Sequence, residues 1–410
     1  MYAEIIAIGS ELTSGEKLDT NSQWLSLQLA DLGIPVLFHT TVADNVDANL
    51  QALQLAVERT DVVLITGGLG PTLDDLTRDV LAHLAGVPLE IDATSLADLE
   101  QFFRGRGREM PERNRIQAMF PQGATPLPNP IGTAPGIWMA FARPDRSPCL
   151  IAAMPGVPSE MHLMFHEQVR PRLPGGARVI RRARLNCFGL GESATEELLG
   201  DLTARGRDPE VGITAHDATI TLRIVAQGAT ESECEAKIAA VTAAAHERLG
   251  DHIFGREDEK LEDVILQRLW QRGETLATVE IATRAQLASR CADATARHQE
   301  QSMAAATLDE SSPFLGGLVL TEATAPITAI AHDRQTHTHA DYVLAIGPEH
   351  WTEVGGRRQS SIDIALRSND GVESSTLTWN GNPAIRLSRT TKTALDLLRR
   401  KLLESGTDVP

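Results

Sequence analysis

The chain is short of cysteine, of long apolar runs and of basic residues. Its four cysteines, Cys149, Cys187, Cys234 and Cys291, are scattered along 410 residues and share no short spacing. The sequence therefore predicts neither a zinc site nor a disulfide framework, and favours buried, reduced thiols. No apolar run approaches the roughly 20 residues that a membrane helix needs, and no basic leader precedes the first apolar segment. We therefore expect a cytoplasmic protein without a membrane partner.

Acidic residues outnumber basic ones, 55 against 38, which gives a formal net charge of −17. An acidic surface repels phosphate backbones, so nucleic acid is not an expected partner. An acidic protein that handles phosphates needs either a local nest of backbone amides or a bound cation. If this protein handles phosphates, we therefore expect one of these two features in its sequence.

The length allows two or three domains. Apolar segments at 4–8, 34–42 and 61–66 alternate with helical patterns at 21–33 and 46–59, which predicts a doubly wound α/β layer. The pattern also predicts a helical region from Gln101 to Arg115, a small α+β segment, and a third segment with a helix at 261–272, strands at 274–279, 316–321 and 341–347, and a closing helix at 391–403.

A glycine-rich stretch, TGGLGPTLDDLT from Thr66 to Thr77, directly follows the apolar strand at 61–66. Glycine permits positive φ and close approach, so the amides at Gly67, Gly68 and Gly70 can point at one anion. Ligands of doubly wound sheets lie beyond the carboxyl ends of the strands, and a helix after this stretch would add its N-terminus. Taken alone, a Gly-Gly-x-Gly turn fits plain turn geometry equally well.

Several acidic residues are expected on the same rim of the sheet. The adjacent carboxylates Asp74 and Asp75 are unfavourable beside an anion site unless they cap the helix or hold a cation, and capping accounts for one of them. Asp44 follows the second strand and is either a loop or capping residue or, with Asp75 and Glu11, a ligand of a divalent ion. Such an ion would neutralise a diphosphate and activate water.

Four motifs in order, AEIIAIGSELTSGEKLDTN, TGGLGPTLDDLTRD, NPIGTAPGIW and MPGVPSEM, resemble those of the CinA family (competence/damage-inducible protein A). The resemblance covers about the first 170 residues. It implies a MogA/MoaB-like domain at 1–174, a KH-like α+β domain at 175–256, an α/β deamidase-like domain at 257–410, and a homodimer. The stretch FGLGESATEE carries glutamates where an RNA-binding KH clamp needs basic residues, so we expect a structural or dimerisation role there.

The resemblance also implies an activity: hydrolysis of ADP-ribose to AMP and ribose 5-phosphate. It implies a divalent metal (Mg²⁺, Mn²⁺ or Co²⁺), with room for a monovalent cation. Asp44 and Asp75 would serve the metal or the attacking water. The implied phosphate and nucleotide contacts are Gly67, Gly68, Gly70, Thr72, Asn21, Gly132, Thr133, Pro155, Gly156 and Glu160. One departure is visible, since the family's Gly-Asp-Glu near the first strand reads Gly9-Ser10-Glu11.

The C-terminal domain of the family is usually a nicotinamide mononucleotide deamidase, with a nucleophilic serine in Glu-Ser-Cys-Thr-Gly-Gly. Here that place reads EIATRA, from Glu280 to Ala285, and Ile281 replaces the serine. Thr321 and Pro326 replace a tyrosine and a lysine of a second motif. Isoleucine cannot attack an amide and proline supplies no cation, so we expect no deamidase activity.

Two functions therefore remain open. One is the metal-dependent hydrolase. The other is a non-catalytic nucleotide- or pterin-binding adaptor linked to competence or recombination, with a RecA-type partner. Ser10 and the lost deamidase residues favour this second function. Molybdopterin transfer, a third function, rests on fold analogy alone.

Overall fold

The computed structural model of the protein describes residues 1–175, 178–304, 312–354, 357–379 and 383–404. It divides into two compact units: Met1–Arg181 with Gln227–Cys234, and Arg182–Ala226 with Glu235–Pro410. Most of the middle segment therefore clusters with the C-terminal segment. Among the described residues, no helix has both the length and the apolar character to cross a membrane.

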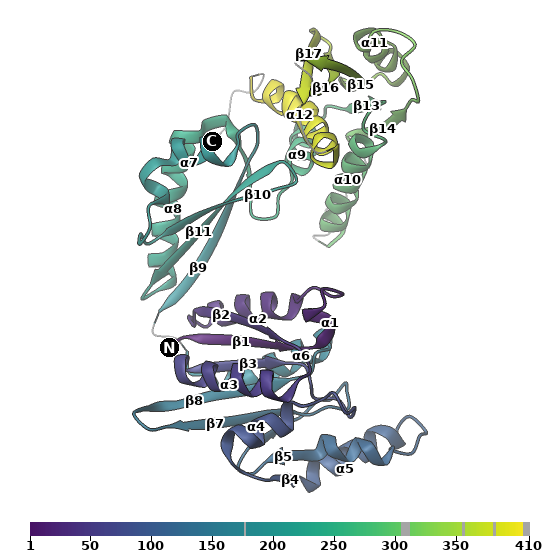
Figure 1. The fold of residues 1–410 in the computed structure, drawn as a ribbon. Coiled ribbons are helices and arrows are strands. Elements are labelled where there is room, and N and C mark those ends of the chain that lie inside the picture. Colours follow the sequence, from purple (N-terminus) through teal and green to yellow (C-terminus); the bar gives the residue numbers. More distant parts are fainter. Residues whose placement is uncertain (176–177, 305–311, 355–356, 380–382, 405–410) are drawn as a thin grey trace. The chain divides into compact units, whose positions relative to one another are not determined.

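The first unit is built on a six-stranded sheet in the order β2-β1-β3-β8-β7-β6 (Figure 1). The first four of these strands are parallel, whereas β7 and β6 are antiparallel to their neighbours. The strands are β1 (Ala3–Ile8), β2 (Val36–Val42), β3 (Val62–Thr66), β6 (Thr125–Leu127), β7 (Gly136–Arg143) and β8 (Arg146–Met154). Every residue of β1 and β3 is buried, as expected for central parallel strands.

Both faces of this sheet are covered by helices because alternate residues of each strand point to opposite sides. Ile6 packs in one core with residues of α3 (Val46–Arg59) and α4 (Thr77–Ala85). Ile5 packs in another core with residues of α2 (Thr20–Asp31) and α6 (Pro158–Met164). The predicted doubly wound layer is confirmed.

The expected helical region from Gln101 to Arg115 is wrong in its bounds. Helix α5 (Ala93–Arg104) ends at Gly105, and helical structure resumes only in a 3₁₀ segment, Glu112–Ala118. Gly107 has a φ of +67°, and Pro111 precedes the second segment, so the backbone cannot continue as one helix. The first unit is completed by α1 (Ser10–Thr13) and the strand pair β4 (Leu89–Ile91) and β5 (Met119–Pro121).

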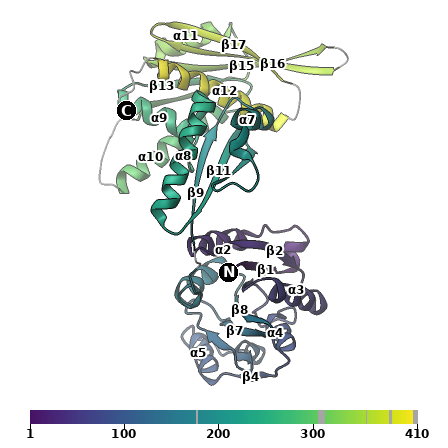
Figure 2. The same cartoon turned by 90° about the vertical axis from the view of Figure 1, so that its left-hand side faces the viewer.

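The middle segment forms a four-stranded sheet in the order β10-β11-β9-β12 with two α-helices, the expected α+β arrangement (Figure 2). Its elements are β9 (Val179–Cys187), α7 (Glu192–Leu199), β10 (Glu210–His216), β11 (Thr219–Gly228), α8 (Glu231–Leu249) and β12 (Ile253–Arg256).

The C-terminal segment holds a mixed five-stranded sheet in the order β14-β13-β15-β16-β17. The three expected strands are present as β13, β14 and β15, which are parallel to one another, but two long antiparallel strands, β16 and β17, were not predicted. The elements are α9 (Leu261–Arg272), β13 (Leu276–Glu280), α10 (Gln286–Ala304), β14 (Phe314–Val319), α11 (Ile327–Thr338), β15 (Tyr342–Val354), β16 (Arg357–Ser368), β17 (Gly371–Trp379) and α12 (Pro383–Glu404).

An ion-pair network joins the β10–β11 turn to the C-terminal helices within the second unit. Asp217 in the turn accepts hydrogen bonds from Arg290 of α10 at 2.8 Å and from Ser388 of α12. Lys392 Nζ donates to Thr219 Oγ1 at 2.7 Å and lies 3.1 Å from the Asp217 carboxylate. Burial opposes ionisation of Asp217, but the bonds from Ser388 and Arg290 outweigh it and hold its pKa well below the usual range.

All four cysteines are free and buried, which confirms the sequence expectation. Burial raises the pKa of the Cys149 and Cys187 thiols to about 12, so both are protonated at neutral pH.

Candidate functional site

The stretch from Thr66 to Thr77 leaves the carboxyl end of β3 as a tight loop, as predicted. Gly67 and Gly68 have φ of +105° and +65°, which favour glycine. A Cβ on Gly67 would lie 2.2 Å from the Ile8 carbonyl oxygen, and one on Gly68 would lie 2.3 Å from Thr77 Oγ1. The loop thus passes so close to β1 and α4 that neither position has room for a side chain.

Hydrogen bonds from Thr77 fix the direction of two peptide groups in this loop. Thr77 Oγ1 donates to the Gly67 carbonyl at 2.9 Å, and the Thr77 amide donates to the Gly68 carbonyl at 3.1 Å. A trans peptide points its N–H opposite to its carbonyl, so the amides of Gly68 and Leu69 point away from Thr77. Neither amide has an acceptor within the part of the chain that the structure describes. These two amides are the donors of a candidate anion nest; Gly68 is half-buried and Leu69 is buried.

Asp75 binds its own loop rather than the following helix. Its Oδ1 accepts from the Gly70 amide at 2.7 Å, and its Oδ2 accepts from the Thr72 amide at 2.8 Å and from the Thr72 hydroxyl. Helix α4 begins at Thr77 without a side-chain cap. The expectation that one of the two aspartates caps this helix is therefore wrong. The Gly70 and Thr72 amides, predicted to hold phosphate, already donate to Asp75.

A buried arginine lies behind the loop. Arg78 is 1% exposed, and its guanidinium donates to the carbonyls of Leu69 at 2.5 Å and Gly70 at 3.2 Å. Burial lowers its pKa to about 10, and the charges of Asp75 and Asp79 oppose that shift. Arg78 therefore stays protonated at neutral pH and places a fixed positive charge under the loop. Nothing in the sequence distinguishes it from a surface arginine of an amphipathic helix.

The three carboxylates expected to hold a metal do not converge. Among the described residues, no group of three His, Cys, Asp or Glu side chains is arranged to hold an ion. Asp75 is turned onto its loop, and Glu11 lies 3.6 Å from Lys17 Nζ. Asp44 Oδ2 accepts from the Ser10 amide at 2.8 Å, and the Asp44 amide donates to Ser10 Oγ at 3.2 Å. Ser10 thus pairs with Asp44 where the family pattern has a second carboxylate.

Asn21 connects α2 to the end of β3 and to the MPGVPSEM motif. Its Nδ2 donates to Thr66 Oγ1 and to the Gly156 carbonyl, both at 2.9 Å. Thr66 Oγ1 in turn donates to the Pro155 carbonyl at 3.2 Å. Asn21 Oδ1 is buried and has no hydrogen-bond partner in the described parts of the chain. Asn21, Pro155 and Gly156, predicted together, therefore do meet at this rim.

The PNPIGTAPG loop is held by Asn129, which the sequence reasoning did not single out. Asn129 Nδ2 donates to Glu160 Oε2 at 2.7 Å, and its Oδ1 accepts from the Gly132 amide at 3.0 Å. A Cβ on Gly132 would lie 2.2 Å from Glu160 Oε2. Gly132 and Glu160 are therefore in contact, and Glu160 supports the loop.

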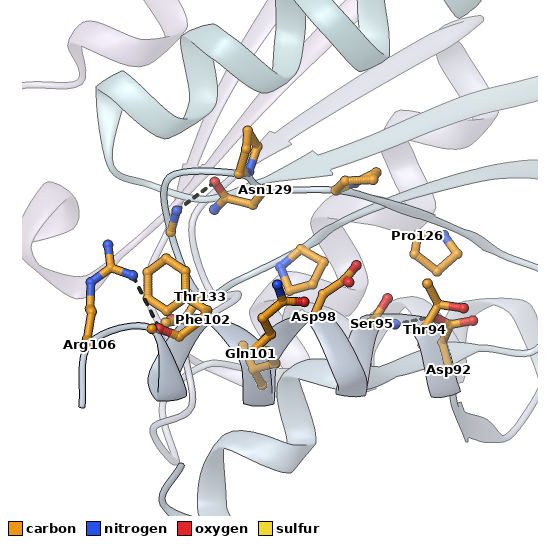
Figure 3. Close-up of a pocket in the computed structure, with 16 residues that line it drawn as sticks. Asp92, Thr94, Ser95, Asp98, Gln101, Phe102, Arg106, Pro126, Asn129 and Thr133 are labelled. Carbon is orange, nitrogen blue, oxygen red and sulfur yellow. Dashed lines mark hydrogen bonds between the residues drawn. The ribbon is translucent and has the colours of Figure 1, made fainter. Parts of the chain in front are cut away.

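Gln117 links this loop to the glycine-rich loop and was also missed. It is fully buried, and its Nε2 donates to the Leu69 carbonyl and to Thr133 Oγ1, each at 3.4 Å. Beside Gly132 and Thr133 lies a cavity of about 910 Å³ whose other wall is α5 (Figure 3). Gln117 thus ties the wall of this cavity to the glycine-rich loop.

Comparisons with known proteins show the family of the chain. The family described as Probable molybdopterin binding domain matches residues 4–175, and the Damage-inducible protein CinA KH domain matches residues 182–255. A CinA-like protein of Frankia casuarinae is 37% identical, covering 98% of this chain and 96% of its own length. The chain belongs to the CinA family. A CinA-like protein of Deinococcus radiodurans is 34% identical over 99% of both chains.

Among solved structures, CinA from Thermoplasma acidophilum is 30% identical over 42% of this chain and 98% of its own, with a TM-score of 0.38. MoaB from Thermus thermophilus is 21% identical over 42% of this chain and 91% of its own, with a TM-score of 0.27. As a CinA family member, the chain has the predicted MogA/MoaB-like N-terminal and KH-like middle folds.

The segment from Glu280 to Ala285 forms the turn between β13 and α10. Glu280 is fully buried and accepts from the amides of Leu287 at 3.1 Å and Ala288 at 2.9 Å, at the start of α10. Arg284 and Ala285, which stand where the family has glycines, have φ of +52° and +69°. Two residues with side chains thus occupy a left-handed turn that suits glycine.

Glycine at either position is expected to stabilise the second unit. Replacing Arg284 or Ala285 by glycine removes a left-handed penalty of about 1–2 kcal/mol but adds backbone entropy to the unfolded chain, for a net gain of about 0.5–1 kcal/mol each. Urea unfolding of the full chain measures the effect. The control Ala292→Gly, on an exposed face inside α10, should lose about 1 kcal/mol. Equal losses in all three variants would contradict this account of the turn.

Proposed function

We propose that the N-terminal domain hydrolyses a nucleotide diphosphate, most specifically ADP-ribose, to AMP and ribose 5-phosphate with a divalent cation. One observation carries the proposal. Four motifs distant in sequence are joined by hydrogen bonds at the carboxyl end of β3. They surround a loop in which two amides have no partner among the described residues and behind which lies a buried arginine. That rim is where doubly wound folds bind phosphate ligands.

In this proposal the loop binds the diphosphate through charge and backbone amides. The Gly68 and Leu69 amides donate to one phosphate, and the Arg78 guanidinium offsets part of the anionic charge from behind the loop. The bonds from Gly70 and Thr72 to Asp75 hold the second half of the loop in place beside these amides. Asp75 is therefore a positioning residue in this mechanism.

The donor set suits a metal that arrives with the substrate rather than a resident one. Mg²⁺ is commonly bound through one or two carboxylates plus substrate phosphates. Asp44 fits that role, because Ser10 engages Oδ2 while Oδ1 receives no hydrogen bond from the described residues. A bound divalent ion would supply charge neutralisation and an activated water. Asp44 would orient that water, and Glu11 lies on the adjoining helix α1.

Restoring the family's acid at position 10 is expected to tighten metal binding. Ser10→Asp adds a carboxylate beside Asp44, so the Mg²⁺ concentration that gives half-maximal hydrolysis should fall about tenfold. Ser10→Asn, which keeps a polar group of similar size without the charge, is the matched control. Equal shifts in both variants, or none in Ser10→Asp, would contradict the assignment of Asp44 to the metal.

A second candidate is a nucleotide-binding adaptor without turnover, since Asp44, Asp75 and Glu11 form no acidic cluster among the described residues. It would use the same loop and bind ADP-ribose tightly, and its partners would be a second copy of the chain and a recombination protein. Product formation separates the two candidates, because both predict binding.

We further propose that the C-terminal segment releases no ammonia from nicotinamide mononucleotide. Ile281 supplies no nucleophile. Thr321 and Pro326 are exposed, and they supply neither the tyrosine nor the lysine of the family motif. Because Phe188 and Phe254 of the middle segment pack into the C-terminal core, the full chain is the proper sample. Ammonia release above the blank would overturn this prediction.

A further inference from the structure

The cavity beside Thr133 has two walls of different chemistry. Helix α5 forms one wall, with Asp92, Asp98 and Phe102 facing the opening (Figure 3). The other wall comes from the segment 126–135 and is rich in proline: Pro126, Pro128, Pro130 and Pro135. A volume of about 910 Å³ is within the range of small-molecule sites.

Two carboxylates and one cation, Arg106, line this cavity, so its charges disfavour phosphate. Asp92 and Asp98 both line it, and Asp98 is exposed and receives no hydrogen bond or ion pair from the described residues. Two carboxylates repel an anion but accept hydrogen bonds from hydroxyl or amino groups. The polar groups therefore suit sugar hydroxyls or the exocyclic amine of a base.

A cation–π pair lies at the C-terminal end of α5. The Arg106 guanidinium carbon lies 3.5 Å from the centroid of the Phe102 ring, and Arg106 Nη1 donates to the Phe102 carbonyl at 3.5 Å. Arginine planes and aromatic rings are surfaces on which nucleic-acid bases stack. The prolines opposite add a flat apolar surface, so this end of the cavity suits a planar ring.

The cavity adjoins the glycine-rich loop. Thr133 lines the cavity, and Gln117 bonds both to Thr133 and to the Leu69 carbonyl of that loop. The buried Gln117 thus ties one wall of the cavity to the loop that carries the Gly68 and Leu69 amides.

We propose that this cavity binds the nucleoside half of the substrate, with the base against Phe102 and Arg106 and the ribose hydroxyls donating to Asp98. The terminal ribose 5-phosphate of ADP-ribose then lies on the other side of the diphosphate. This assignment rests on the proposed nucleotide diphosphate ligand, but not on its hydrolysis.

Calorimetric binding to the full chain tests the assignment, with AMP and ribose 5-phosphate as separate probes. Phe102→Ala should weaken AMP binding about tenfold and leave ribose 5-phosphate binding unchanged. Asp98→Asn should weaken AMP binding severalfold, since a charged acceptor is lost. Phe103→Ala is the matched control, because Phe103 neighbours Phe102 but does not line the cavity.

The outcomes separate the two proposals. Selective loss of AMP binding in Phe102→Ala and Asp98→Asn supports the nucleoside assignment even if the wild-type chain forms no product. Unchanged AMP binding in both variants, or equal weakening of both probes, overturns the assignment even if ADP-ribose is hydrolysed. If Phe102→Ala fails to fold, Asp98→Asn and the more conservative Phe102→Leu decide by the same comparison.

Discussion

Asp75→Ala is expected to lower kcat/KM for ADP-ribose hydrolysis by at least about 100-fold, the loss typical of a loop displaced by about 1 Å. The Asp75 carboxylate accepts hydrogen bonds from the amides of Gly70 and Thr72. Removal of this carboxylate therefore leaves two donors without an acceptor and frees the loop. The Gly68 and Leu69 amides then lose their fixed direction. AMP formation, followed by chromatography over a range of ADP-ribose concentrations, measures the effect.

The neighbouring aspartate gives a matched control. Asp74 is exposed, and its carboxylate bonds to the Thr72 side chain and to its own amide. Asp74→Ala therefore removes the same charge from the same loop but leaves the bonds from the Gly70 and Thr72 amides to Asp75 in place. Its kcat/KM should stay within about threefold of wild type, because an exposed charge is screened by salt. Equal losses in the two variants would show that charge, not loop geometry, is responsible. Unchanged activity in Asp75→Ala would refute the role given to Asp75.

Gly67→Ala is expected to destabilise the first unit by about 2–5 kcal/mol, the sum of backbone strain and steric overlap. The residue has a φ of +105°, and the added Cβ would lie 2.2 Å from the Ile8 carbonyl oxygen, which is part of the central strand. Neither group can move without disturbing the sheet. Thermal unfolding of the full chain, followed by the transition of the first unit, measures the loss.

Gly86→Ala is the control that separates steric overlap from backbone strain. Gly86 ends α4 with a φ of +66°, and a Cβ there would meet nothing within 4 Å. This control should cost about 1 kcal/mol, the left-handed penalty alone. If Gly67→Ala and Gly86→Ala lowered the melting temperature equally, the close approach of the loop to β1 would be wrong.

The sequence predicted the buried parallel strands well because such strands read as continuous apolar runs. The segment at 61–66 became β3, and the helix predicted at 46–59 is α3. Strands β16 and β17 escaped notice because serine, threonine and charged residues dominate them, and β17 has no buried residue. Their strand conformation is specified by pairing with β15 rather than by an apolar pattern.

The position of the site could be predicted, but its internal contacts could not. Glycines after an apolar strand identify the loop, since backbone rules act locally. Which amides donate hydrogen bonds to Asp75 depends on how the loop folds back on itself. The same holds for the separation of Glu11 from Asp75, since Glu11 lies beside Lys17 instead. Arg78 and Gln117 were missed for a related reason, because burial of a polar side chain depends on segments far away in the sequence.

Hydrolysis of ADP-ribose by the full chain, with Mg²⁺, Mn²⁺ or Co²⁺ and with a chelator as control, tests the central claim most directly. The account predicts AMP and ribose 5-phosphate in equal amounts, formed only when a divalent ion is present. Tight binding of ADP-ribose with no product under any of these metals would contradict it and would identify the domain as a binding module.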